Sequence, residues 1–331
     1  PIGGVMATNG VIIPNAVGVD IGCGMISLAT DFKDDLDEGL IKEIIGKTRE
    51  EIPVGFRHHD KQQEWDGWED APDIQIINQE LKSATRQLGT LGRGNHFIEI
   101  QRSNDGYIWL MIHSGSRNIG LKIAKTYHDI AKQLCDTWFS DIPNKDLSFL
   151  PLDSNQGQEY IQAMLFALGF ARENRRLMMQ RFSGIVMEKL GCKFPSPLLD
   201  VHHNYARMEN HFKQNVMLHR KGATSAKLGE AGIIPGSQGT KSYIVEGLGE
   251  RESFESCSHG AGRKMGRKEA KRSLDLDEQK GSMEGVVHSV RTKDDLDEAP
   301  GAYKDIEMVM SSQTDLVKIV VELTPLGIMK G

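Results

Sequence analysis

Four short stretches of the sequence place metal-binding side chains next to glycine, asparagine or serine. In residues 19–24, glycines on both sides of a cysteine let the backbone turn sharply and leave the sulfur open to a close approach. A lone cysteine of this kind is more often a small buried packing residue. Here, however, histidines occur in three comparable settings at the ends of apolar runs. The candidate metal ligands are Asp20, Cys23, His96, His113 and either His202 or His203.

Five such ligands exceed what one tetrahedral site requires. If the Cys23 thiolate bridges two ions, the set suits a dinuclear centre with its ions roughly 3.5–4 Å apart, which can clamp a phosphate and activate the attacking and leaving groups. Each histidine, taken alone, is equally well explained as a hydrogen-bonded core residue. The shared setting favours the metal-site interpretation, but spacing does not decide between His202 and His203.

Another histidine, His259, lies among small residues in the stretch 256–263, so its imidazole would be open to a ligand. An unprotonated imidazole can attack phosphorus and carry the group as a phosphoramidate. A further metal ligand and a core histidine are the alternatives. Basic residues follow at near-helical spacing up to Arg272 and would suit a phosphate backbone, although a solvated helix surface is the common case.

Composition narrows the class of protein. The 331 residues carry 40 basic and 46 acidic side chains, a net charge of −6, so a nucleic acid would have to bind through a local patch. No apolar run approaches the roughly 20 residues that span a bilayer, and no signal-peptide pattern opens the chain, so we expect a cytoplasmic protein with no membrane partner. Four cysteines without a CxxC pair argue against a disulfide scaffold.

Hydrophobic periodicity predicts the elements that position these residues. Two or three short strands are expected within residues 2–28, and a hairpin over residues 97–112 would carry one histidine on each strand. A long helix over 159–190 has candidate breaks at Gly169 and Gly184, and Arg175 is assigned with its basic neighbours to a solvated face. Shorter helices are predicted over 34–51, 73–88 and 117–139. Without a repeat or a linker, the sequence gives no reason to divide the chain.

Nine motifs occur in a fixed order between residues 18 and 331. They are Gly-Val-Asp-Ile-Gly-Cys-Gly, Gly-Asn-His-Phe-Ile-Glu, His-Ser-Gly-Ser-Arg, His-Asn, His-Arg-Lys-Gly-Ala, Pro-Gly-Ser-Gln-Gly-Thr, Ser-His-Gly-Ala-Gly-Arg, Ala-Tyr-Lys-Asp and Pro-Leu-Gly-Ile-Met-Lys-Gly. The set resembles the RtcB family of GTP-dependent RNA ligases. The resemblance implies an α+β fold with mixed β-sheets surrounded by helices, and one catalytic domain over residues 1–331. Family members usually carry a further N-terminal segment before the position of Pro1, and this segment is expected to be missing here.

The resemblance also assigns roles to residues. It implies two Mn²⁺ ions bridged by Cys23, with Asp20 and His96 completing one coordination sphere and His113 and His203 the other. His259 matches the histidine that becomes guanylylated. The positions implied to hold the nucleotide are Asn95, Glu99, Asn204, Ser237, Ser242, Gly260, Ala261, Gly262, Tyr303 and Lys330. Of these, Glu99 and Lys330 would recognise the guanine.

The implied reaction joins an RNA 2′,3′-cyclic phosphate or 3′-phosphate end to a 5′-hydroxyl end, with GTP as co-substrate, in RNA repair or tRNA splicing. A dinuclear metallophosphoesterase would use the same metal ligands to activate water, but would have no use for His259, Tyr303 or Lys330. A metal-stabilised RNA-binding module without catalysis is the other alternative.

Overall fold

The computed structural model describes residues 3–331, which form eight α-helices and fourteen strands. The helices are α1 (Pro14–Val17), α2 (Glu38–Glu51), α3 (Gln75–Gln87), α4 (Arg117–Thr137), α5 (Asn155–Leu190), α6 (Arg267–Ser273), α7 (Leu276–Gly281) and α8 (Ile306–Ser311). The strands are β1 (Gly4–Thr8), β2 (Val11–Ile12), β3 (Gly24–Ala29), β4 (Phe97–Ser103), β5 (Ile108–Ser114), β6 (Leu150–Pro151), β7 (Leu199–His202), β8 (Asn204–His211), β9 (Gln214–Lys221), β10 (Ala223–Ser225), β11 (Ala231–Ile234), β12 (Ser242–Gly247), β13 (Ser256–Ser258) and β14 (Val317–Lys330).

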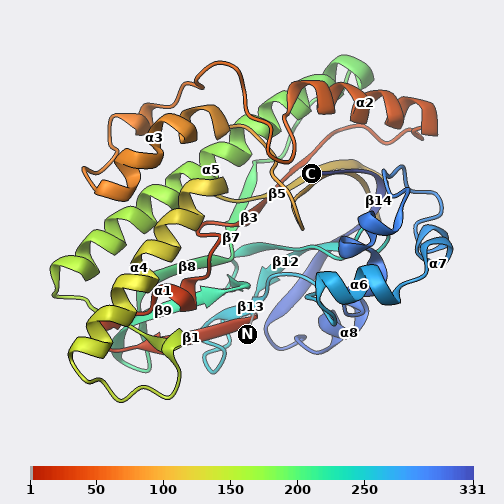
Figure 1. Cartoon of the computed structure of the whole chain (residues 1–331). Helices are drawn as coiled ribbons and strands as arrows, with labels where there is room; N and C mark the ends of the chain where they lie inside the picture. Colours follow the sequence, from red (N-terminus) through yellow and green to blue (C-terminus); the bar gives the residue numbers. More distant parts are fainter. Residues whose placement is uncertain (1–2) are drawn as a thin grey trace.

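A seven-stranded sheet in the order β11-β12-β14-β4-β5-β3-β7 forms the centre of the molecule. In Figure 1, α2, α3, α4 and α5 gather on one side of it, and α6, α7 and α8 lie on the other. A three-stranded sheet, β1-β9-β8, stands beside it. The predicted α+β fold is confirmed. The expected mixture of strand directions is limited, among the described residues, to isolated parallel bridges such as Val54 with Gly92, because the paired strands are all antiparallel.

The helix α5 contributes to two apolar cores because its 36 residues make it about 54 Å long. Towards its N-terminus, Phe166 and Phe170 pack with α3 and α4 in the first core. Towards its C-terminus, Met178 and Phe182 pack with α2 and the central sheet in the second core. Ser154 caps its start by accepting a hydrogen bond from the Gly157 backbone at 3.0 Å. The predicted breaks at Gly169 and Gly184 are wrong, since the helix runs without interruption.

The chain just before Cys23 differs from the prediction of short strands within residues 2–28. Residues Pro14–Val17 form a single helical turn, for which proline at the first position is well suited. The strand β3 begins only at Gly24, so the Asp20–Cys23 turn leads into a strand instead of following one. The hairpin of β4 and β5 is confirmed, with Phe97 paired to His113.

No helix among residues 3–331 is long and apolar enough to cross a membrane.

Candidate active site

The turn that carries Asp20 and Cys23 packs tightly against its neighbours. Gly22 has a φ of +73°, and a side-chain carbon there would lie 2.8 Å from the Cβ of Ala171 on α5. Backbone hydrogen bonds fix the turn, because Cys23 N donates to the Asp20 carbonyl at 3.1 Å and His203 N donates to the Cys23 carbonyl at 2.9 Å. The glycine-flanked cysteine of the sequence is therefore held in a compact, well-supported turn.

The five predicted metal ligands come together although they lie on four separate segments. The Sγ of Cys23 lies 3.5 Å from His96 Nε2 and 3.2 Å from His113 Nε2. On one side, Asp20 Oδ2 is 3.0 Å from His96 Nε2, and on the other, His203 Nε2 is 3.3 Å from His113 Nε2. The sulfur is thus the common neighbour of two imidazoles, each of which has one further donor atom beside it.

Backbone carbonyls set which imidazole nitrogens are free to bind an ion. His96 Nδ1 is 3.0 Å from the Leu91 carbonyl, and His113 Nδ1 is 3.0 Å from the Asn95 carbonyl, so in both rings Nδ1 carries the proton. Their Nε2 atoms then lie against the Asp20 carboxylate in one case and against His203 Nε2 in the other. Such an arrangement is favourable when a cation or a proton stands between the atoms. The donor set therefore fits a divalent metal site.

Burial governs the protonation of these groups. It lowers the pKa of His113 and of His203 well below the ordinary value, so both imidazoles are neutral at pH 7. Burial raises the pKa of Cys23 well above that of a free thiol, and the nearby Asp20 adds to the effect. Burial acts against ionisation of Asp20 as well, but its hydrogen bond and charge interaction with His96 still lower its pKa. Metal binding would displace the Cys23 proton.

Geometry separates His203 from its neighbour. His202 ends β7 and its Nδ1 lies 3.1 Å from the Gly22 carbonyl and 3.2 Å from a guanidinium nitrogen of Arg175, on the side of α5. His203 faces the cavity instead, because successive side chains of an extended chain point in opposite directions. Only His203 converges on the other predicted ligands.

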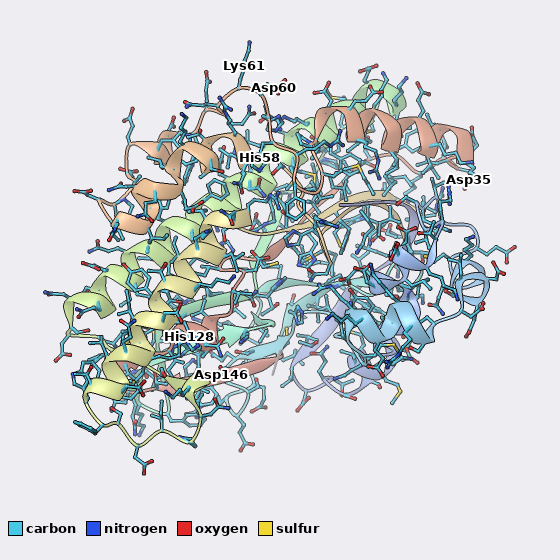
Figure 2. The ribbon with its side chains drawn as sticks, viewed as in Figure 1. Asp35, His58, Asp60, Lys61, His128 and Asp146 are labelled. Carbon is cyan, nitrogen blue, oxygen red and sulfur yellow. The ribbon has the colours of Figure 1, made fainter. Side chains whose placement is uncertain are left out.

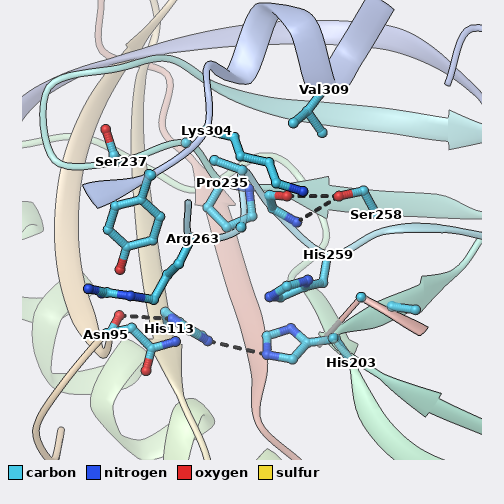
Figure 3. A pocket seen from close by; sticks show the side chains of 18 of the residues that line it. Asn95, His113, His203, Pro235, Ser237, Ser258, His259, Arg263, Lys304 and Val309 are labelled. Atoms are coloured by element: carbon cyan, nitrogen blue, oxygen red, sulfur yellow. Dashed lines mark hydrogen bonds between the residues drawn. The ribbon is translucent and has the colours of Figure 1, made fainter. Parts of the chain in front are cut away.

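A cavity of about 1490 Å³ opens above these ligands. Figure 3 shows His259 lying over His203, with their ring centroids 4.9 Å apart. Burial lowers the pKa of His259, although a hydrogen bond to the Gly222 backbone opposes this, so the ring is neutral at pH 7. All the residues implied to hold the nucleotide line the same cavity, namely Asn95, Glu99, Asn204, Ser237, Ser242, Gly260, Ala261, Gly262, Tyr303 and Lys330. Their roles stay predictions, but the chain folds so that they share one space with His259.

Two of these residues also make hydrogen bonds within the protein. The Asn204 amide donates to the Asp20 carbonyl at 3.0 Å and its oxygen accepts from Gly222 N at 2.8 Å, so it supports the metal-ligand turn. Glu99 is buried and accepts a hydrogen bond from Gln101, which also donates to Ser242, and this burial raises the pKa of Glu99 to about 8.

The buried carboxylate of Glu298 was not identified from the sequence. It accepts hydrogen bonds from Arg263 Nη1 at 2.7 Å, from Arg267 Nε at 2.6 Å and from the Tyr303 hydroxyl. Its carbonyl accepts from Gln238 Nε2 at 2.6 Å. Glu298 therefore joins the segments of His259, Ser237 and Tyr303. The predicted basic face is in part ion-paired, and its helix, α6, begins only at Arg267.

Two further unrecognised residues lie on α5. Asn174 and Arg175 are fully buried, and the predicted solvated position of Arg175 is wrong. Its guanidinium donates to the carbonyls of Gly22 and Ser114 at 2.9 and 3.0 Å and pairs with Asp200. A signal was present for Asn174, because it stands four residues from the buried Phe170 on the apolar face of the helix.

A second group with metal-binding side chains, Glu209, His211 and Glu255, lies outside the cavity. Burial acts to raise the pKa of Glu209, but hydrogen bonds from Arg220 and His211 hold it at about 2. Its charge is already neutralised by Arg220, so we regard the group as an ion pair that stabilises the fold.

Known proteins are similar to this chain over its whole length. A family model described as the tRNA-splicing ligase RtcB matches residues 1–331. The RNA-splicing ligase RtcB of Escherichia coli K12 is 37% identical, over all of this chain and 86% of the relative. The tRNA-splicing ligase RtcB of Thermococcus kodakarensis is 31% identical, over all of this chain and 85% of the relative, and the RNA-splicing ligase RtcB of Mycobacterium tuberculosis is 30% identical, over all of this chain and 94% of the relative. This chain belongs to the RtcB family.

Proposed function

We propose that this protein is a GTP-dependent RNA ligase that joins an RNA 3′-phosphate or 2′,3′-cyclic phosphate end to a 5′-hydroxyl end, in RNA repair or tRNA splicing. The family and the names of its relatives support RNA ligation. The finer chemistry is supported by one observation above all. A neutral histidine, His259, lies directly over the predicted metal ligands in a cavity lined by the predicted nucleotide-binding residues.

In the first step, a ring nitrogen of His259 attacks the α-phosphorus of GTP. The bond from that phosphorus to the bridging oxygen breaks, and pyrophosphate leaves. Because the imidazole is neutral at pH 7, its lone pair is available without a separate base. When bound, two Mn²⁺ ions held by Asp20, Cys23, His96, His113 and His203 would screen the negative charge of the phosphates.

In the second step, an RNA 3′-phosphate oxygen attacks the phosphorus carried by His259 and takes over the GMP. A cyclic phosphate must first be opened by water to give that 3′-phosphate. In the third step, a 5′-hydroxyl attacks the activated 3′-phosphate and GMP leaves, which forms a 3′,5′ linkage. Glu99 and Lys330, side by side in the cavity wall, are proposed to select guanine through charged hydrogen bonds.

The experiment that tests this proposal is intact-mass spectrometry after incubation with GTP and Mn²⁺. We expect the added mass of one GMP on the unmutated chain and none on His259→Ala. His128→Ala is the matched control, since His128 lies on α4, outside the cavity lining (Figure 2), and should still take up GMP.

A chain that binds metal and hydrolyses phosphate esters but never forms the adduct would favour the dinuclear phosphoesterase. A chain that binds RNA without either activity would favour the non-catalytic RNA-binding module. We also propose that residues 1–331 act as one catalytic domain.

A further inference from the structure

An exposed aromatic ring stands beside the active-site loops. Phe56, between α2 and α3, is 81% exposed. The guanidinium of Arg93 lies over its ring at 4.7 Å from the centroid. Single apolar residues on a surface are common. A guanidinium stacked on such a ring is less common, and Arg93 and Phe56 together form a flat surface that is partly charged.

The loop that carries Phe56 is fixed to the loop that carries the predicted metal ligand His96. Leu91 N donates to the Pro53 carbonyl at 3.0 Å, and Gly55 N donates to the Gly92 carbonyl at 2.8 Å. Arg117 donates to the Gly55 carbonyl at 3.1 Å and interacts by charge with Asp20. Phe56 is thus held beside the loop that leads to His96, because these contacts fix the backbone just before it.

Positive charge gathers around this ring despite the net negative charge of the chain. Arg57, next to the ring in the sequence, is exposed, and so is Arg86, whose charge acts on the neighbouring His58. Burial is the largest cause that lowers the pKa of His58, and the charges of Arg117 and Arg86 add to it. The pKa of Arg49 is also lowered, first by burial and then by the charge of Arg57.

Acidic groups are also present, at Glu51 and Asp60. Figure 2 shows Asp60 and Lys61 projecting to solvent from the loop beyond His58. The basic helix α6 begins beside the loop that carries Arg93. A side-chain carbon on Gly94 would lie 3.2 Å from a guanidinium nitrogen of Arg267, the first residue of α6.

We propose that Phe56 and Arg93 form a stacking platform for a nucleobase of the single-stranded RNA whose end enters the cavity, with Arg57 contacting its phosphate backbone. Aromatic and guanidinium planes stack on bases of any sequence, and surrounding basic residues hold the backbone. This inference rests on the proposed function, because it takes RNA as the substrate. It adds an RNA contact outside the nucleotide cavity, at residues that do not line it.

The test measures binding of a single-stranded RNA with a 3′-phosphate and a fluorescent 5′ end, by anisotropy, with Mn²⁺ and without GTP so that no ligation occurs. Phe56→Ala is expected to weaken binding by about 5- to 160-fold, as expected when one base loses its stacking partner. Phe56→Trp is expected to bind at least as tightly as the unmutated chain. Arg93→Lys, which keeps the charge and loses the plane, should weaken binding by about 3-fold or more.

The matched control is Phe139→Ala. Phe139 is 94% exposed and follows the far end of α4, about 30 Å along that helix from Arg117. Its removal should leave RNA binding unchanged. Every variant should still take up GMP. This separates the inference from the proposed function, because an unmutated chain that forms no GMP adduct would count against the ligase and not against the RNA platform. Phe56→Ala binding RNA within 2-fold of the unmutated chain would overturn the platform.

Discussion

At the residue scale, burial changes what familiar side chains do. Glu99 is a glutamate that is 3% exposed, and burial raises its pKa to about 8, although Gln101 and Lys330 act in the opposite direction. Near pH 7 the side chain therefore holds a proton. An ionised Glu99 would be the better acceptor for the N–H groups of guanine, so nucleotide binding should favour loss of this proton.

This raised pKa predicts how stability changes with pH. The folded chain holds the Glu99 proton more tightly than the unfolded chain, so the contribution to the free energy of unfolding is full below about pH 4.5 and is lost as pH rises through about 8. Glu99→Gln removes this dependence. We expect the variant to gain stability relative to the unmutated chain between pH 5.5 and 8, by roughly 2–4 kcal/mol.

Urea unfolding of both proteins at several pH values measures this difference. Glu246→Gln, an exposed change on the same sheet, should give a curve parallel to that of the unmutated chain. A difference between Glu99→Gln and the unmutated chain that stays constant with pH would show that Glu99 does not titrate in this range.

At the element scale, the helix α5 holds the loops of the active site in register. The Asn174 side-chain oxygen accepts from Gly89 N at 2.7 Å and Thr90 N at 3.1 Å, and its amide nitrogen donates to Thr90 O, Ser114 Oγ and Gly115 O, each at 3.2 Å. These contacts lie just before the loop of His96 and just after the strand of His113. One amide on a helix therefore sets the spacing between two predicted metal ligands.

Removing this amide should affect stability and metal binding together. Asn174→Ala leaves several buried backbone groups without partners, which we expect to lower the free energy of unfolding by about 3 kcal/mol and to reduce the bound Mn²⁺ measured by mass spectrometry of the digested protein. Arg172→Ala, an exposed change on the same helix, should cost less than about 0.5 kcal/mol and leave the metal content unchanged. Full metal content in folded Asn174→Ala would contradict this role.

Local sequence predicted those elements whose signals are local. The hairpin of β4 and β5 follows from two strand-like runs separated by a turn at Asn104–Gly106, and α3 was expected over nearly its observed range. The buried position of Arg175 could not be predicted, because Asp200 and the carbonyls of Gly22 and Ser114 approach it from distant parts of the chain. The buried position of Glu298 could not be predicted for the same reason, since the fold brings its hydrogen-bond partners together.

At the scale of the whole molecule, the central sheet is assembled from both ends of the chain. The last strand, β14, lies between β12 and β4, and it continues through Pro325 by means of a bulge. Contacts this far apart in sequence close only when most of the chain has folded. Lys330 therefore reaches the cavity as part of a central strand, and the whole sheet fixes its position relative to His259.

The two apolar cores should consequently unfold together, since α5 is shared by both. Phe170, in the first core, and Phe182, in the second, are each fully buried on this helix. Phe170→Ala and Phe182→Ala should each lower the free energy of unfolding by about 3–5 kcal/mol. Because two of the four tryptophans, Trp65 and Trp68, pack against Phe170, tryptophan fluorescence includes a signal from the first core, whereas far-UV circular dichroism follows all the helices. In urea, both probes are expected to give one coincident transition in each variant. If Phe182→Ala instead separated the two transitions, the chain would consist of two independent units, and the single catalytic domain proposed for residues 1–331 would have to be abandoned.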